Sequence, residues 1–275
     1  MKIIISHDID HLTASEHFTD TFIPKFIIRS KIELLFGKIS FKEFLLRFDG
    51  IFKNKWNNIS ELIDFNEKHD IPATFFIGVN NGVGLNYKLE LAEKWIHEIV
   101  KRGVNCGVHG IAYNNFEDVK KEFNTFRSIS GLNDFGIRMH YLRNDENTFN
   151  NLANAGYLFD TTDFGLKKHY KIGNMHEFPL HIMETYEMEG GKKWQGRNTK
   201  DAIDSTIKQI VEAEKNGIEY LTILFHDRYF EDAFLSWKNW YIQIIDYCKS
   251  QGYEFFDYNN AIQLINKNLN EGVIT

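Results

Sequence analysis

The sequence predicts an α/β protein in which helices cover a parallel sheet or barrel. Three observations lead to this fold class. Short apolar segments alternate with amphipathic segments after residue 60. A glycine follows most of the amphipathic segments, which is typical of the end of a helix. Polar and charged residues recur directly after the apolar segments, at the strand ends where such folds carry their functional sites.

The expected elements follow one another as strand and helix along most of the chain. Runs of β-branched and aromatic residues predict strands at about residues 3–5, 73–77, 104–108, 135–138, 157–159, 220–225 and 253–256. Apolar residues at helical spacing predict helices at about 88–102, 116–128, 146–155 and 200–215, a long helix through Trp237 and Tyr247, and a closing helix from Asn260.

Residues 21–48 depart from this alternation. They are apolar and aromatic, yet they carry a local charge of +4 from Lys25, Arg29, Lys31, Lys38, Lys42 and Arg47 against Glu33 and Glu43. We expect a helical hairpin, broken near Pro24 and Gly37, inside an insertion of about residues 14–60. One interpretation is a lid or an oligomer contact. The other is a basic amphipathic surface for a membrane or a lipid-linked substrate.

Composition narrows the class of protein. The 275 residues suit one domain covering residues 1–275, and the net charge of −6 argues against nucleic-acid binding. Cys106 and Cys248 are too isolated for a zinc cluster or a disulfide framework, so we expect reduced thiols. We find no secretory signal and no apolar run long enough to span a membrane, and therefore expect a cytoplasmic protein.

The densest chemistry is Ser6-His7-Asp8-Ile9-Asp10-His11, directly after the first apolar strand. In an extended chain Asp8 and Asp10 lie on one side, and His7, Ile9 and His11 lie on the other. Two carboxylates this close repel each other unless a metal, an arginine or a shared proton neutralises them. The segment therefore predicts a metal-assisted acid/base site.

Other reactive residues follow the later strands. The carboxyl ends of parallel strands meet at one rim, so we expect these side chains to gather there. Together with Asp8 and Asp10 of the first strand, the residues expected at this rim are His109, Arg138, His140, Asp160, Asp163, His226 and Asp227. Histidines outside these segments, such as His17, are expected to be solvated.

These segments carry a family resemblance. In chain order, His7-Asp8-Ile9-Asp10-His11, residues 71–76, Gly107-Val108-His109-Gly110, residues 136–141 and residues 222–226 resemble the polysaccharide deacetylase (NodB-homology, carbohydrate esterase family 4) superfamily. The first motif is similar to the HDxDH branch among bacterial surface-polysaccharide biosynthesis proteins. The resemblance implies a distorted (β/α)₇ TIM-like barrel, with a helical insertion after the first strand. It also implies a hydrolase that uses one divalent metal, usually zinc.

The resemblance also implies a role for each site residue. Asp8 matches the general base, Asp10 and His109 match metal ligands, and Arg138 matches the arginine that orients the base. A metal acidifies its bound water, and a free carboxylate takes the proton, so the chemistry needs both kinds of group.

The last two matches concern the leaving group. His226 matches the acid that protonates the leaving amine, and Asp160 matches the aspartate that supports this acid. The implied substrate is an N-acetylated amino sugar of a surface polysaccharide or of its lipid- or nucleotide-linked precursor.

One position departs from the pattern. The family's second motif has another histidine ligand four residues after the first, where this chain has Tyr113. A phenol with a reference pKa of about 10 is a poor zinc ligand at neutral pH. Another residue could complete the shell, the candidates being His7, His11, Asn114 and His140. Otherwise the site has lost metal and catalysis, and the protein binds glycan or supports a biosynthetic complex. Tyr113 favours a weakened metal site, and Tyr113→His should then strengthen it.

Overall fold

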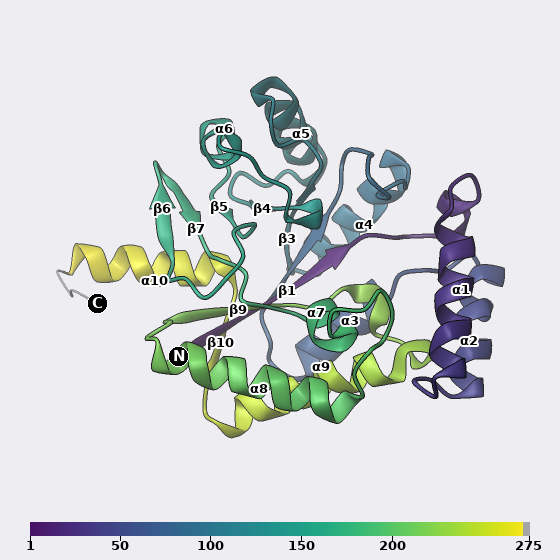
Figure 1. The fold of residues 1–275 in the computed structure, drawn as a ribbon. Helices are drawn as coiled ribbons and strands as arrows, with labels where there is room; N and C mark the ends of the chain where they lie inside the picture. The colour runs from purple at the N-terminus through teal and green to yellow at the C-terminus, as the bar shows by residue number, and fades with distance from the viewer. Residues whose placement is uncertain (272–275) are drawn as a thin grey trace.

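The computed structural model describes residues 1–271 as a curled, mostly parallel sheet covered by helices (Figure 1). The strands are β1 (Lys2–Ile9), β2 (Ala73–Ile77), β3 (Asn105–Gly110), β4 (Gly136–Met139), β5 (Phe159–Asp160), β6 (Tyr170–Ile172), β7 (Met175–Glu177), β8 (Ile182–Met183), β9 (Tyr220–Leu224) and β10 (Glu254–Phe256). Their order in the sheet is β6-β7-β5-β4-β3-β2-β1-β9-β8, and β10 pairs with the start of β1. The expected distorted (β/α) barrel is confirmed.

Helices connect these strands, and all but α3 and α7 lie near positions that the sequence predicts. The α-helices are α1 (Phe22–Leu35), α2 (Phe41–Phe52), α3 (Ile59–Lys68), α4 (Leu89–Lys101), α5 (Phe116–Ser130), α6 (Thr148–Ala155), α7 (Glu184–Glu189), α8 (Thr199–Lys215), α9 (Leu235–Ser250) and α10 (Tyr258–Asn270). Short 3₁₀ helices are η1 (Ala14–His17), η2 (His140–Leu142), η3 (Asp227–Tyr229) and η4 (Asp232–Phe234). Within residues 1–271, no helix is both long and apolar enough to cross a bilayer.

Strand β1 is the centre of the sheet. Its residues Ile3, Ile4 and Ile5 are fully buried between β9 on one side and β10 and β2 on the other. The strand then continues past this apolar part, so that Asp8 and Ile9 still pair with β2. Burial of the apolar half therefore fixes the position of the charged half at the carboxyl edge of the sheet.

The same edge receives residues from β3 and β4. Their register places His109 directly opposite Arg138. Gly107 allows this close pairing, because a Cβ atom there would lie 2.7 Å from the Gly136 carbonyl oxygen and 2.8 Å from the Phe76 ring. The sequence pattern around His109 thus has a packing reason as well as a chemical one.

The insertion after β1 is a helical hairpin, as expected. Helices α1 and α2 lie side by side at one end of the molecule (Figure 1). The chain turns at Gly37, whose φ of +64° favours glycine. The expected break near Pro24 was wrong. Pro24 lies in the first turn of α1, where the missing N–H breaks no helical hydrogen bond.

A buried ion-pair network holds this hairpin together. The Arg47 guanidinium donates to Glu33 at 2.5 Å, and both side chains are almost completely buried. Arg29 donates to the other oxygen of Glu33 at 2.8 Å and also pairs with Glu189 of α7. The Gln195 backbone N–H donates to Glu33 as well. The hairpin is therefore fixed to the barrel through one buried carboxylate.

We predict that Glu33→Gln loosens the hairpin. The substitution leaves the buried Arg47 cation without its counter-charge, a change that costs about 3–5 kcal/mol in comparable buried pairs. Amide exchange across residues 22–52 should accelerate by a corresponding factor. Glu61→Gln, which removes one half of an exposed ion pair with Lys55, is the matched control and should behave as wild type. Equal exchange in the two variants would contradict this account.

Candidate metal and acid/base site

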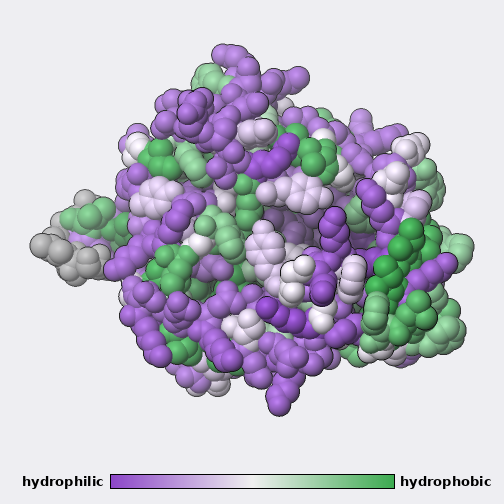
Figure 2. Space-filling view, viewed as in Figure 1, coloured by the Kyte–Doolittle hydropathy of each residue, from purple (hydrophilic) through white to green (hydrophobic). Residues whose placement is uncertain are grey.

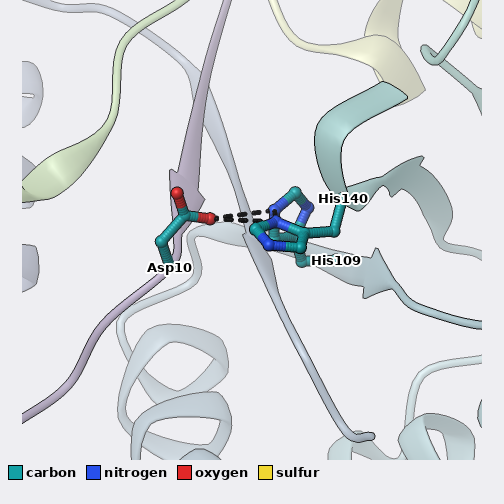
Figure 3. A group of neighbouring side chains, drawn as sticks. All are labelled: Asp10, His109 and His140. Carbon is teal, nitrogen blue, oxygen red and sulfur yellow. Dashed lines mark hydrogen bonds and ion pairs between the residues drawn. The ribbon is translucent and has the colours of Figure 1, made fainter. Parts of the chain in front are cut away.

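Three side chains converge at the carboxyl edge of the sheet (Figure 3). Asp10 follows β1, His109 lies on β3, and His140 begins η2 after β4. The Asp10 Oδ1 atom lies 3.1 Å from His109 Nε2 and 3.3 Å from His140 Nδ1. The two histidine nitrogens are themselves 2.9 Å apart. Asp10 is the most exposed of the three, so the cluster is open to solvent on the aspartate side.

The outer nitrogen of each imidazole determines its tautomer. His109 Nδ1 lies 3.1 Å from the Arg138 carbonyl oxygen, and His140 Nε2 lies 3.1 Å from the Val83 carbonyl oxygen. A carbonyl only accepts, so both outer nitrogens carry the proton. The inner nitrogens of the neutral rings therefore present lone pairs to each other and to a carboxylate. Such an arrangement requires a cation, either a metal ion or an additional proton.

The donor set suits a divalent metal. Two imidazoles and one carboxylate are the protein ligands of several catalytic zinc sites, and their bonds of about 2.0–2.1 Å place ligand atoms about 3.3 Å apart. Two of the three distances here are slightly shorter than that separation and the third equals it, so little movement would admit an ion. The backbone carbonyls behind the rings supply the outer-shell partners that metal-bound histidines normally have.

Of the four candidates for a third ligand, His140 is therefore the one that lies beside Asp10 and His109. The turn that holds it is strained, because Tyr141 and Leu142 both have positive φ values, +57° and +52°. Each left-handed non-glycine residue costs about 1–3 kcal/mol, and such strain is concentrated at functional sites. The strained turn therefore lowers the stability of the fold while it fixes the orientation of the His140 ring.

The other candidates for the third ligand lie elsewhere. His7 is buried between the Phe225 carbonyl and the Asn66 side chain, and burial lowers its pKa to about 3. His11 pairs with His17. Asn114 is exposed, and the Tyr113 ring lies under the Arg143 guanidinium, 5.1 Å from ring centroid to Cζ. The cluster of three metal-ligand candidates contains none of them.

Asp8 and Arg138 form a second buried pair beside this cluster. Arg138 Nη1 donates to Asp8 Oδ1 at 2.8 Å, and the guanidinium also donates to Ser6, Thr161 and Tyr258. Both side chains are almost fully buried. Asp8 Oδ2 lies 3.8 Å from His109 Nδ1. Arg138 therefore supplies the counter-charge of Asp8 and holds one oxygen, while the second oxygen lies near the outer nitrogen of His109.

His226 completes the rim on the far side of Asp10. Its Nε2 lies 3.5 Å from Asp10 Oδ2, and its Nδ1 lies 2.5 Å from Glu184 Oε1. Burial by itself would lower the pKa of His226, but the carboxylates of Glu184 and Asp10 outweigh it and raise the pKa to about 10. An imidazolium at this position is a proton donor at neutral pH.

Sequence reasoning missed Glu184, which holds the position that the resemblance gives to Asp160. Asp160 is buried opposite Glu177 in the β5–β7 pair, and its hydrogen-bond donor is Thr162. Among the described contacts, none joins Asp160 to His226. The segment after Asp160 supports Arg138 instead, through the Thr161 carbonyl and hydroxyl. Glu184 directly follows β8, so its place at a strand end was the one available signal.

A second buried cluster was also unexpected. His17 is fully buried rather than solvated, and its Nε2 lies 2.8 Å from His11 Nδ1. Glu16 lies beside both rings, and Asp20 accepts from His17 Nδ1. These contacts satisfy one another as a hydrogen-bond network, which attaches η1 to the end of β1.

Comparison with known proteins identifies the fold. A protein from Mycobacterium smegmatis described as a polysaccharide deacetylase has a TM-score of 0.59 and 13% identity, over 92% of each chain. One from Pseudomonas aeruginosa PAO1, also described as a polysaccharide deacetylase, has a TM-score of 0.62 and 11% identity, over 100% of this chain and 92% of that one. Puue allantoinase has a TM-score of 0.62 and 13% identity, over 100% and 91%.

The chain therefore shares its fold with two proteins described as polysaccharide deacetylases and with an allantoinase. No protein-family model and no curated protein matches the sequence at a significant level. At 11–13% identity, the likeness establishes the fold and leaves the activity to the site.

The geometry offers His140 as the third ligand that the sequence left open, which favours a complete metal site over a weakened one. We predict that the wild-type chain binds zinc, that His140→Ala lowers its affinity by at least about 100-fold, and that Tyr113→His changes it little. Isothermal titration of metal-free protein measures all three. A large gain in zinc affinity in Tyr113→His, with no loss of affinity in His140→Ala, would contradict His140 as the third ligand and favour position 113.

Proposed function

We propose that this protein is a zinc-dependent deacetylase that removes the N-acetyl group from an amino sugar of a glycan or of its precursor. One observation carries the proposal: Asp8, the three-residue cluster of Asp10, His109 and His140, and His226 lie together at one edge of the sheet. A glycan-binding protein without catalysis would need neither the buried Asp8–Arg138 pair nor a charged His226.

The base acts on the water that attacks the acetyl carbonyl. A zinc ion held by Asp10, His109 and His140 would polarise that carbonyl and acidify the water. Asp8 takes the water proton through Oδ2, since Arg138 donates to Oδ1. The C–O bond then forms as this proton leaves the water.

The acid acts on the opposite bond. His226 carries a proton on Nε2, which faces Asp10, while Glu184 holds Nδ1. When the C–N bond breaks, His226 gives this proton to the amine, which leaves as the free amino sugar. The order base, metal, acid across the rim is the order that amide hydrolysis needs.

The proposed substrate rests on the similarity of the fold to described deacetylases, and an assay of acetate release tests it. Two of the similar structures are described as polysaccharide deacetylases and one is an allantoinase. Purified protein loaded with zinc should release acetate from N-acetylated amino-sugar oligosaccharides and should leave allantoin unchanged. If the protein hydrolyses allantoin and not the oligosaccharides, the proposed metal site would stand and the proposed amino-sugar substrate would be wrong.

We predict that Asp8→Asn lowers kcat by about 10²–10⁴-fold, the usual range for loss of a general base. The amide oxygen can still accept from Arg138, so the fold and zinc affinity should be retained. Asp64→Asn, a change to an exposed carboxylate paired with Arg102, is the matched control. Wild-type kcat in Asp8→Asn would remove Asp8 as the base.

We also predict a pH effect for Glu184→Gln. The Glu184 carboxylate raises the pKa of His226, so replacing it by an amide lowers that pKa. The protonated acid is then lost at a lower pH, and the alkaline limb of the kcat/KM profile moves towards neutrality. Glu187→Gln, in the same helix and paired with Arg197, should leave the profile in place. An alkaline limb that does not move in Glu184→Gln would contradict the proposal that Glu184 raises the pKa of the catalytic acid.

A further inference from the structure

The α1–α2 hairpin has an inverted distribution of polarity. A helix on the surface of a soluble protein normally buries its apolar face and exposes its charges. Here the buried side chains of α2 are Glu43 and Arg47, and those of α1 include Ser30 and Glu33. Apolar side chains face outward instead, and Leu35 and Phe52 are 84% and 86% exposed.

These outward residues form one continuous surface. Phe41, Leu45 and Phe52 recur at helical spacing along α2, and Ile28 and Leu35 do the same along α1. Figure 2 shows the result as an apolar area over the end of the molecule that holds the two helices. We call this area the hairpin patch; it consists of Phe18, Ile28, Leu35, Phe36, Phe41, Leu45 and Phe52. These are seven of the 17 large apolar residues exposed in the described chain, gathered in 35 residues.

The hairpin also carries exposed positive charge. The described ion pairs of residues 21–48 use both arginines and Glu33, and Glu43 caps the start of α2 from a buried position. The segment's excess positive charge is consequently carried by four lysines. They are Lys25, Lys31, Lys38 and Lys42, of which all but Lys38 are exposed. The acidic residues Glu33 and Glu43 are buried, and the lysines remain on the outside of the hairpin, which also exposes aromatic and aliphatic side chains.

We propose that the hairpin patch docks this protein on the surface of a bilayer that contains anionic phospholipid. Aromatic and aliphatic side chains enter the interface between headgroups and acyl chains, and the lysines contact the lipid phosphates. A second copy of the chain is a poorer occupant. A symmetric contact through this patch would bring the four lysines of each copy towards those of the other, and Asp49, already paired with Lys53, is the one acidic side chain of the two helices that is not buried. The docking goes beyond the deacetylase activity and does not depend on it.

The hairpin is also connected to the reactive edge of the sheet. Arg29 of α1 pairs with Glu189 at the end of α7, and Glu184 at the start of the same helix holds His226. Arg47 donates to the Ala233 carbonyl, shortly after His226 in the chain. A docked hairpin would therefore hold the acid side of the site at a fixed place relative to the bilayer, as a substrate with a lipid anchor requires.

Vesicle sedimentation tests the docking with the full chain. The protein should bind vesicles of phosphatidylcholine with about one-third phosphatidylglycerol at least about tenfold more tightly than vesicles of phosphatidylcholine alone. Leu35→Asp/Phe52→Asp should lose at least about tenfold of this binding. Lys31→Gln/Lys42→Gln should lose most of the preference for anionic lipid. Leu269→Asp, an exposed leucine on α10, is the matched control and should bind as wild type.

Two outcomes would overturn the proposal. One is equal, weak sedimentation of all four proteins with both vesicles. The other is a wild-type dimer in solution that becomes a monomer in Leu35→Asp/Phe52→Asp, which would assign the patch to a second copy. Light scattering without vesicles measures the mass. Acetate release from a soluble oligosaccharide should be the same in wild type and patch variants, so failure of docking and failure of the deacetylase activity are separately visible.

Discussion

The site depends on one electrostatic constraint: two imidazoles bring their inner nitrogens 2.9 Å apart beside a carboxylate. His109 and His140 cannot turn their protons inward, because the Arg138 and Val83 carbonyls already accept them on the outer side. Only a cation makes this arrangement stable. The strand register that places His109 beside Arg138 and the strained turn after His140 both serve to hold these two rings in position.

The two neighbouring aspartates of β1 are neutralised in different ways. Asp8 has a permanent partner in the buried Arg138, and Asp10 shares its oxygens between the histidine pair and His226. Asp8 thus has a fixed cationic partner, as the proposed base requires, and Asp10 has no such fixed partner, as the proposed ligand requires. Separate counter-charges allow two like charges to lie two residues apart without losing either function.

Much of this arrangement could be predicted from the sequence. The apolar start of β1 and the reactive residues after successive strands were sufficient to place Asp8, Asp10, His109, Arg138 and His226 at one edge. The third ligand could not be chosen, because no spacing along the chain brings residue 140 to residue 109. That contact depends on the β3–β4 register and on two left-handed residues. Glu184 follows a two-residue strand, too short for any periodicity, and the outward direction of the apolar residues in α2 contradicts the usual rule.

X-ray absorption spectroscopy at the zinc edge tests the central claim most directly, because it counts imidazole ligands without depending on activity. For the wild-type chain loaded with one equivalent of zinc, we predict a shell of nitrogen and oxygen atoms at about 2.0–2.1 Å, with the multiple-scattering signal of two imidazoles. His140→Ala should show one imidazole. A wild-type spectrum with a single imidazole, or one unchanged by His140→Ala, would contradict the assignment of His109 and His140 as a pair of ligands.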